Sequence, residues 1–370
     1  MAEHRKDSEF RSQAIDESIT VFFWCSGQDD NIGDVVLRRC LYGQLVRHAM
    51  GSIHVYVGKS SDSFIEALGL DSRATLYRSK SAWLRAILCS SQSPLVVFDP
   101  GELRLNDSVV PHLALLPMQV LARARGGRSV KLGISIRSDL PTSAVSRLAF
   151  RLSGALVSDV VWRDVATARI YAGGRLGCDW AFGDYDERAW AAEAPRNFLA
   201  ISVRDDKPLW TQAHADTIRE FCDQQGLTPI VFVQVRRDND VASRLAERIG
   251  CDLVLWPSHV THAEQEGIVR QLMRQSVAVL GDRLHALIVG ATEGAIPVGL
   301  TGIDDTKIGA HLEAIGLFTY TREISSLSPH GLTAFLRSVI SKRAQVANAI
   351  SDANRVVAEM GYAIRGEAGR

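Results

Sequence analysis

The sequence predicts an α/β protein with two domains, each built on a parallel sheet, and a long helix near the C-terminus. At 370 residues the chain exceeds the size of a typical single domain. Short apolar runs alternate with helical patterns twice along the chain, and a glycine-rich stretch at residues 171–196 separates the two series. Strands and helices that alternate at this spacing form parallel sheets through right-handed crossovers.

The first domain is expected at residues 19–190, after a polar tail at residues 1–18 that lacks the apolar core of a secretory signal. Its strands are rich in apolar and β-branched residues and are expected at residues 19–25, 52–57, 94–98, 130–136 and 156–161. Helices are expected at residues 35–48, 61–68, 109–124 and 143–152. Asp34 is the expected N-cap of the first helix.

The second domain is expected at residues 196–330, with strands at residues 198–203, 229–232, 252–256, 277–280 and 296–300. Its helices are expected at residues 213–225, 241–249, 264–275 and 286–291. A long amphipathic helix at residues 331–365 follows, with Ser328 and Pro329 as its start signals, and it is free to pack back on the first domain. Two Rossmann-like domains joined in this way form the GT-B architecture, and a cleft between such domains is a natural ligand site.

The composition excludes several classes of function. Lys plus Arg equals Asp plus Glu, at 42 each, so no overall field would attract nucleic acid. No apolar stretch is long enough for a transmembrane helix. The six cysteines lack CxxC spacing, which fits reduced thiols in the cytoplasm and argues against a zinc site or a disulfide framework. We therefore expect a cytoplasmic protein without a nucleic-acid partner, whose oligomeric state the sequence leaves open.

Residues 277–291 are the most informative segment. An apolar run that ends at Leu280 is followed by Gly281 and Asp282, and then Arg283 and His285 begin a second apolar run. Such a strand-to-helix junction, at the carboxyl edge of a parallel sheet, is where open α/β folds bind ligands. The helix N-terminus adds free N–H groups and the positive end of a dipole. A cation and an imidazole at this place suit an anionic ligand that needs both charge neutralisation and a proton.

Several motifs, taken in order along nearly the whole chain, resemble those of the polysaccharide pyruvyltransferase family. They are Asn31-Ile32-Gly33-Asp34, Gly133-Ile134-Ser135, Val161-Trp162-Arg163-Asp164, Asp179-Trp180-Ala181-Phe182, Ser202-Val203-Arg204 and Gly281-Asp282-Arg283-Leu284-His285-Ala286, followed by Pro297 and Lys307. Each motif is weak alone, and their order and spacing make the resemblance specific. Trp180 replaces a proline of the family, and residues 301–305 lack the aromatic residue that many members carry before the lysine. These departures bear on the identity of the acceptor.

The resemblance implies an enzyme that transfers pyruvate from phosphoenolpyruvate to two hydroxyls of a saccharide as a cyclic ketal, with release of phosphate, in exopolysaccharide or cell-surface glycan biosynthesis. It implies that no further cofactor is used. The implied donor-binding residues are Arg204, Arg283, His285 and Lys307. The acceptor-binding candidates are Asn31, Gly33, Asp34 and Asp164.

The chemistry of this donor fits these residue types. Arginine forks match a carboxylate and a phosphate, so Arg204 and Arg283 can hold one group each. The enol methylene must gain a proton, and His285 is the expected general acid, with Arg283 beside it in the catalytic pair. Asp34 and Asp164 are candidates to remove protons from the acceptor hydroxyls. Because arginines supply the positive charge, this scheme needs no metal.

Structural roles remain open for the same residues. Arg283 is also able to form an ion pair with Asp282 or a nearby carboxylate, and Asn31, Gly33 and Asp34 are also compatible with a turn and a helix cap. Arg163 and Asp164 are interpreted as a surface or interdomain pair, and Lys307 has the alternative of a solvated charge. The basic run at residues 123–131 is either a solvated loop or a contact with a lipid-linked acceptor at the membrane surface.

Two other functions also remain open. A GT-B glycosyltransferase that uses a nucleotide sugar would share the architecture, and the fold alone does not decide between them. A saccharide-binding protein on the same scaffold would bind glycan without releasing phosphate.

Overall fold

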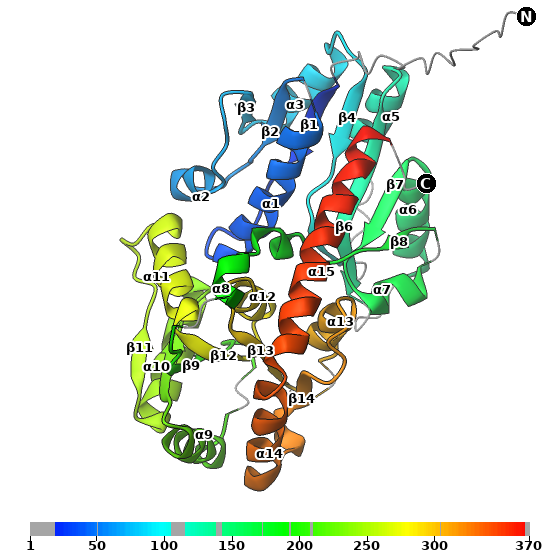
Figure 1. Ribbon diagram of the computed structural model, residues 1–370. Coiled ribbons are helices and arrows are strands. Elements are labelled where there is room, and N and C mark those ends of the chain that lie inside the picture. Colours follow the sequence, from blue (N-terminus) through cyan, green and yellow to red (C-terminus); the bar gives the residue numbers. More distant parts are fainter. Residues whose placement is uncertain are drawn as a thin grey trace, which may run out of the picture.

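The computed structural model describes residues 19–49, 51–104, 115–137, 143–171, 173–191, 194–207, 210–303 and 305–366. Two parallel sheets, in the upper and lower halves of Figure 1, form two lobes, and a long helix near the C-terminus runs beside both. The expected fold class is confirmed. No helix among these residues is both long and apolar enough to cross a bilayer.

The sheet of the first lobe has the strand order β3-β2-β1-β4-β6-β7-β8, with β5 paired to β6. All of its pairings are parallel. Its strands are β1 (Thr20–Trp24), β2 (Ile53–Tyr56), β3 (Ala74–Tyr77), β4 (Pro94–Val97), β5 (Gly101–Arg104), β6 (Arg128–Arg137), β7 (Asp159–Trp162) and β8 (Arg175–Leu176). The central strands are continuous apolar runs because both of their faces are covered.

The helices of this lobe are α1 (Ile32–His48), α2 (Asp62–Ala67), α3 (Lys80–Leu88), α5 (Leu116–Ala124), α6 (Ala144–Ala155) and α7 (Val165–Ile170). The expected cap at Asp34 is wrong, because Asn31 caps α1 and Asp34 lies in its first turn. An Asn at the N-cap with an acidic residue three positions later resembles a capping box, so either side chain suits a cap. Of the expected helix at residues 109–124, residues 109–114 lie outside the described residues.

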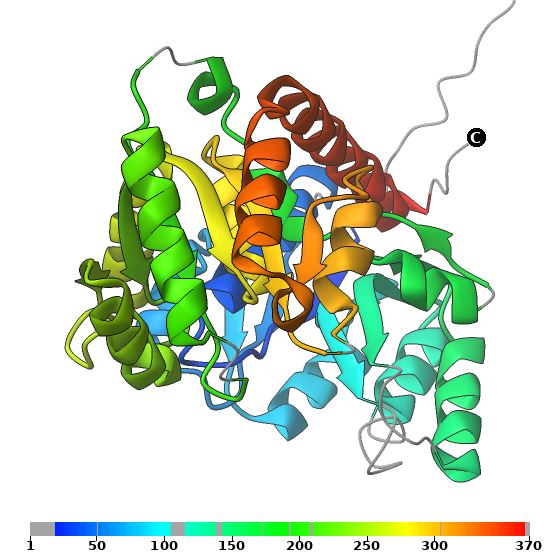
Figure 2. The same cartoon turned by 90° about the horizontal axis from the view of Figure 1, so that it is seen from below.

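The sheet of the second lobe has the order β11-β10-β9-β12-β13-β14, again with parallel pairing throughout. Helices surround its strands in the view from below (Figure 2). The strands are β9 (Phe198–Ser202), β10 (Thr228–Phe232), β11 (Asp252–Val254), β12 (Ser276–Gly281), β13 (Ile296–Thr301) and β14 (Thr321–Glu323). The helices are α9 (Gln212–Gln225), α10 (Asn239–Ile249), α11 (His262–Arg274), α12 (Leu284–Thr292) and α13 (Lys307–Glu313).

The glycine-rich stretch between the two series is structured rather than only a connection. It contains β8, the short 3-10 helix η1 (Trp180–Asp184) and α8 (Glu187–Ala191). Trp180 and Phe182 are fully buried, and η1 packs against α1, α12 and the C-terminal helix. At Gly177 a Cβ atom would lie 2.6 Å from Val161 and 2.7 Å from the sulfur of Met360. Some glycines here therefore permit close packing. In the sequence, glycines that serve packing cannot be told from glycines that mark a loop.

The expected long C-terminal helix is two helices, α14 (Pro329–Ile340) and α15 (Arg343–Gly361). The break at residues 341–342 is polar and exposed or half-buried, so it falls within the helical period and leaves no sequence signal. Beyond the break, α15 contacts η1 and α1 and runs beside the first lobe (Figure 1). Arg128 of β6 donates hydrogen bonds to the carbonyls of Ala363 at 3.1 Å and Ile364 at 2.6 Å, which fastens the end of this segment.

The basic run at residues 123–131 is not a solvated loop along its whole length. Its last residue, Lys131, lies in β6 with 2% exposure, and its ammonium group contacts the rings of Phe98 and Phe150. The hydroxyl of Ser153, at 3.1 Å, is its hydrogen-bond partner. Burial lowers the pKa of Lys131 to about 8. Lys131 belongs to the strand expected at residues 130–136, and the structure shows that this strand carries it into the interior.

The Lys131→Met variant should be more stable than wild type near neutral pH, because a charged group is no longer buried. Between pH 8 and the ordinary lysine value, the unfolded chain binds a proton that the folded protein does not, so wild-type stability rises with pH. The advantage of the variant should therefore shrink by up to about 1.4 kcal/mol per pH unit above pH 8. Urea unfolding of both proteins at several pH values measures this. The same substitution at exposed Lys59 is the control, and an equal pH trend there would contradict the assignment.

Candidate functional site

A cavity of about 630 Å³ lies between the two sheets. Its lining residues follow the carboxyl ends of strands in both lobes: Ser26 follows β1, Asp99 β4, Arg163 β7, Arg204 β9 and Asp282 β12. Because parallel strands end at one edge of a sheet, the two edges face each other across this cavity. This is the place where open α/β folds bind ligands.

The N-x-G-D loop of the first lobe reaches across to the second lobe. Asn31 accepts a hydrogen bond from the N–H of Gly33 at 2.9 Å, and the same oxygen accepts one from the side-chain amide of Gln234. An isolated β-bridge pairs Asn31 with Val235. The loop is therefore fixed to the segment that follows β10, and its Asn serves to cap a helix and join the lobes.

Gly33 and His285 are in direct contact. A Cβ atom at Gly33 would lie 2.3 Å from Cβ of His285 and 2.5 Å from its Nδ1, so a glycine is needed for α1 to approach this ring. His285 is the second residue of α12 and lines the cavity. Its Nε2 lies 3.5 Å from Oδ2 of Asp179 and has no hydrogen-bond partner among the described residues. Residues from both predicted halves of the site thus meet at this imidazole.

Arg163 and Asp179 form a buried pair behind His285. Arg163 is 2% exposed, and its guanidinium donates to Asp179 at 2.8 Å and to the hydroxyl of Ser135 at 3.1 Å. Burial alone would raise the pKa of Asp179, but Arg163 and then His285 outweigh it and hold this pKa well below its usual range. The interpretation of Arg163 as a surface or interdomain pair with Asp164 is wrong. Asp179 does more than organise a connection, because it faces both cationic groups.

Arg283 and Arg204 both line the cavity, each with a carboxylate partner. Arg283 donates from Nε to Asp238 at 2.7 Å, so the alternative of an ion pair with a nearby carboxylate is confirmed, with Asp238 rather than Asp282 as the partner. Arg204 holds Asp206 through two hydrogen bonds of 2.8 and 2.6 Å. Asp282 instead accepts from the backbone N–H of Arg204 at 3.0 Å. Burial, opposed by the two arginines, raises the pKa of Asp282 to about 7.

Lys307 enters the cavity from the start of α13. Its ammonium group lies 2.6 Å from Glu102 of the first lobe, and its side chain is 36% exposed. The alternative of a solvated charge is therefore wrong, because this lysine forms an ion pair across the cleft. His311, one helical turn later, also lines the cavity.

The two carboxylates predicted to contact the acceptor have structural partners. Asp34 accepts from the backbone N–H of Gln28 at 2.7 Å and lies 3.4 Å from Arg38. Asp164 caps α7 by accepting from the N–H of Thr167 at 2.7 Å and from its hydroxyl at 2.8 Å. Both line the cavity, but Asp164 uses both of its oxygens for the cap.

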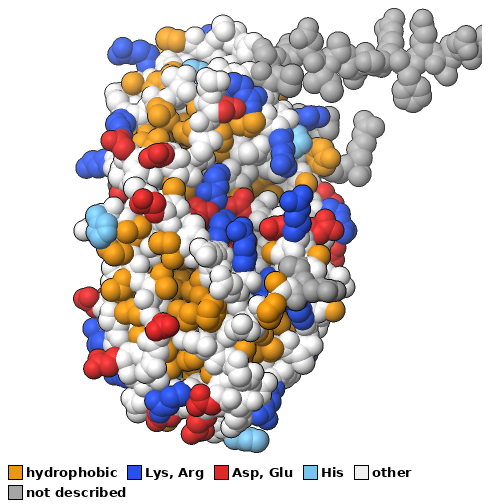
Figure 3. All heavy atoms as spheres, turned by 60° about the vertical axis from the view of Figure 1, so that its left-hand side comes forward, with side chains coloured by type: hydrophobic (Ala, Val, Ile, Leu, Met, Phe, Trp, Pro, Cys, Tyr) orange, Lys and Arg blue, Asp and Glu red, His pale blue; other side chains and the backbone are white. Residues whose placement is uncertain are grey.

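Several ionisable residues of the cavity lining were not assigned a role by the sequence analysis. They are Arg38, Asp99, Glu102, Lys207, Asp282, Asp305 and His311. Asp99 and Asp282 each come directly after a buried strand, so the rule that ligands bind at strand ends could have found them. His311 has no such signal, because it lies inside a short helix. Around the middle of the face in Figure 3, cationic and anionic side chains lie side by side. Among the described residues, no group of three His, Cys, Asp or Glu is placed to hold a metal ion.

Comparisons with known proteins identify the fold. No known family matches the sequence, and no curated protein matches it. S. aureus MnaA in complex with UDP superposes with a TM-score of 0.55 at 10% identity over 94% of this chain and 95% of that chain. Neisseria meningitidis UDP-GlcNAc 2-epimerase bound to UDP-GlcNAc gives 0.55 at 9% identity over 92% and 99%. A mutant of Thermobaculum terrenum O-GlcNAc transferase gives 0.50 at 12% identity over 95% of this chain, which spans 66% of that protein. At these identities the likeness concerns the fold, which is GT-B-like.

The Gly33→Ala variant should disturb the site specifically. The added methyl group must displace His285 or separate α1 from α12, at a cost on the order of 1–3 kcal/mol. Gly43→Ala in the same helix is the matched control, because no atom lies within 4 Å of its added Cβ. That control should gain up to about 1 kcal/mol from helix propensity. Thermal unfolding compares the two variants, and equal stabilities would contradict the contact.

Proposed function

We propose that the protein is a pyruvyltransferase, which moves the pyruvate unit of phosphoenolpyruvate onto two hydroxyls of a saccharide as a cyclic ketal and releases phosphate. The observation that carries this proposal is the convergence of Arg163, Arg204, Arg283, Lys307 and His285, from both lobes, on one cavity. The acceptor is proposed to be a precursor of exopolysaccharide or cell-surface glycan in the cytoplasm. It is free, or lipid-linked at the inner face of the membrane.

The lining of the cavity favours a small polyanion over a nucleotide. Among the described residues, no Phe, Tyr or Trp side chain lines the cavity, so none of them offers a base a ring to stack on. The cationic side chains instead suit a ligand with two anionic groups on one carbon. A cavity of about 630 Å³ also exceeds what phosphoenolpyruvate alone would fill, which leaves room for a sugar.

The ion pairs of the cavity suit exchange of one anion for another. Asp206, the partner of Arg204, is 62% exposed, so this pair is weak and an incoming carboxylate or phosphate can replace Asp206. Asp238, the partner of Arg283, is 2% exposed and stays in place, which holds that guanidinium in a fixed orientation. We therefore assign Arg204 as the mobile clamp and Arg283 as the fixed one.

The proposed reaction assigns a proton to each step. His285 donates a proton to the methylene carbon of phosphoenolpyruvate, which makes C2 electrophilic, and one acceptor hydroxyl adds there with loss of its proton. The bond from C2 to the phosphate oxygen then breaks. The second hydroxyl adds to C2, and its proton leaves with the phosphate. Asp179 lies behind the imidazole of His285, with Oδ2 3.5 Å from Nε2, and orients the ring.

Phosphoenolpyruvate-dependent phosphate release tests this function directly. Wild-type protein is incubated with phosphoenolpyruvate and a panel of glycosides, and release is expected only with an acceptor that offers two suitably placed hydroxyls. Thermal unfolding runs in parallel, because a ligand at 100 times its Kd stabilises by about 2.7 kcal/mol. Stabilisation by UDP and not by phosphoenolpyruvate, together with transfer from a nucleotide sugar, would replace this proposal with a glycosyltransferase.

The His285→Gln variant should lose about 100-fold or more in kcat, since the amide keeps size and polarity but cannot donate a proton to carbon. Its stability should stay close to wild type, because Nε2 of the His285 ring has no hydrogen-bond partner among the described residues. Steady-state phosphate release measures the loss, and phosphoenolpyruvate-dependent thermal shifts check that the donor still binds. A variant with wild-type turnover would remove His285 from the mechanism.

A further inference from the structure

His311 is a second cavity histidine whose ring has one committed nitrogen and one unused nitrogen. It lies in α13 with 2% exposure and lines the cavity. Its Nδ1 lies 2.8 Å from the carbonyl oxygen of Lys307. Because a carbonyl can only accept, Nδ1 must carry the proton, and in the neutral ring Nε2 then keeps its lone pair. Nε2 has no hydrogen-bond partner among the described residues.

The surroundings keep this ring neutral. Burial lowers the pKa of His311 well below its usual value, and the positive charge of Arg163 acts in the same direction. Asp164 and Asp179 oppose the shift, and Lys307 adds to it. Two of these groups are cations, and the two carboxylates are already held by other partners, Asp179 by Arg163 and Asp164 by the first turn of α7. Near neutral pH the His311 ring is therefore uncharged, and its Nε2 can accept a proton.

An unpartnered buried acceptor is destabilising, and a ligand that brings a hydrogen-bond donor can offset this. Phosphoenolpyruvate at neutral pH offers acceptor oxygens, whereas a saccharide offers hydroxyl donors. Lys307 lies one turn earlier on the same face of α13, and both residues line the cavity. A hydroxyl that reaches Nε2 would therefore lie beside the lysine assigned to the donor.

We propose that His311 is the general base, whose Nε2 accepts the proton of the acceptor hydroxyl that adds to C2 of phosphoenolpyruvate. This inference rests on the proposed pyruvyl transfer and adds the acceptor side of the site to it. The O–H bond of the sugar breaks, the new O–C2 bond forms, and Nε2 takes the proton. His285 gives its proton to the methylene carbon, so at the end of the step His285 has lost a proton and His311 has gained one. Proton exchange with solvent restores both rings before the next turnover.

The test compares two substitutions at this position with a matched control. His311→Asn keeps an N–H group that can reach the Lys307 carbonyl but has no lone pair at the place of Nε2, and His311→Gln changes the reach of the amide. Both should lose about 100-fold or more in kcat. Their KM for phosphoenolpyruvate should stay within a few-fold of wild type. His330→Asn, on the exposed surface of α14, is the control and should turn over as wild type does.

Nitrogen NMR of the wild-type histidines gives a readout that does not depend on turnover or on variant folding. The His311 signals, identified by their loss in the variants, should show a neutral ring protonated at Nδ1 near pH 7. An imidazolium, or a ring protonated at Nε2, would overturn the assignment.

The failures of the two proposals differ. Wild-type phosphate release together with near-normal turnover of His311→Asn overturns His311 as the base and leaves pyruvyl transfer standing. Absence of phosphate release by wild type with every glycoside overturns pyruvyl transfer, and the role of His311 in it falls at the same time.

Discussion

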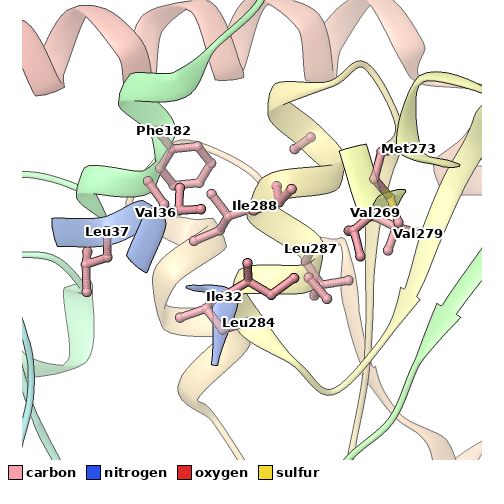
Figure 4. Close-up of a cluster of buried hydrophobic side chains, with 14 of the residues drawn as sticks. Ile32, Val36, Leu37, Phe182, Val269, Met273, Val279, Leu284, Leu287 and Ile288 are labelled. Carbon is pink, nitrogen blue, oxygen red and sulfur yellow. The ribbon is translucent and has the colours of Figure 1, made fainter. Parts of the chain in front are cut away.

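The site depends on one apolar contact between the lobes. Figure 4 shows Ile32 and Val36 of α1, Phe182 of η1, and Leu284 and Ile288 of α12 lying against one another, all of them buried. Full burial of such side chains contributes about 1.5–3 kcal/mol each. The first turns of α1 and α12 carry two of the lining residues of the cavity, Asp34 and His285. Their positions are therefore set by a core that both lobes share, and separating the lobes would expose it.

Charge reinforces this contact and does not replace it. Arg39 of α1 and Arg270 of α11 both pair with Asp184 and Glu266, at 2.6–2.7 Å, so a network of partly buried ions spans the lobes. Ion pairs of this kind add little net stability, but they penalise any arrangement that breaks them. The cationic side chains of the cavity are paired with carboxylates in the same way. A protein with equal numbers of acidic and basic residues can therefore gather several cations around one cavity. In the proposed reaction, a ligand anion would replace the exposed carboxylate of Asp206 at Arg204 without leaving the guanidinium unpaired.

Sequence periodicity predicted the fold well, because parallel strands covered on both faces must be short apolar runs. It failed where packing alone determines structure: the break between α14 and α15, before Arg343, has no local signature. The strand-end rule placed Arg204, Arg283 and His285 at one edge of a sheet, and the structure brings them to one cavity. It could not supply their partners. Whether a strand-end charge faces a carboxylate or solvent depends on residues far away in the chain, and one sequence does not pair them.

The fold restricts the range of possible reactions less than the residues of the cavity do. Two parallel sheets can be built from sequences that share about one residue in ten, since burial and periodicity are satisfied by many apolar combinations. Charged residues at strand ends are not interchangeable in this way, because each needs a partner at hydrogen-bond distance. The two cavity histidines illustrate the point. One ring has a carboxylate at 3.5 Å, and the other donates to a backbone carbonyl at 2.8 Å near Arg163. Two copies of one residue type thus differ in their partners, and the proposed reaction would use this difference to separate the proton donor from the proton acceptor.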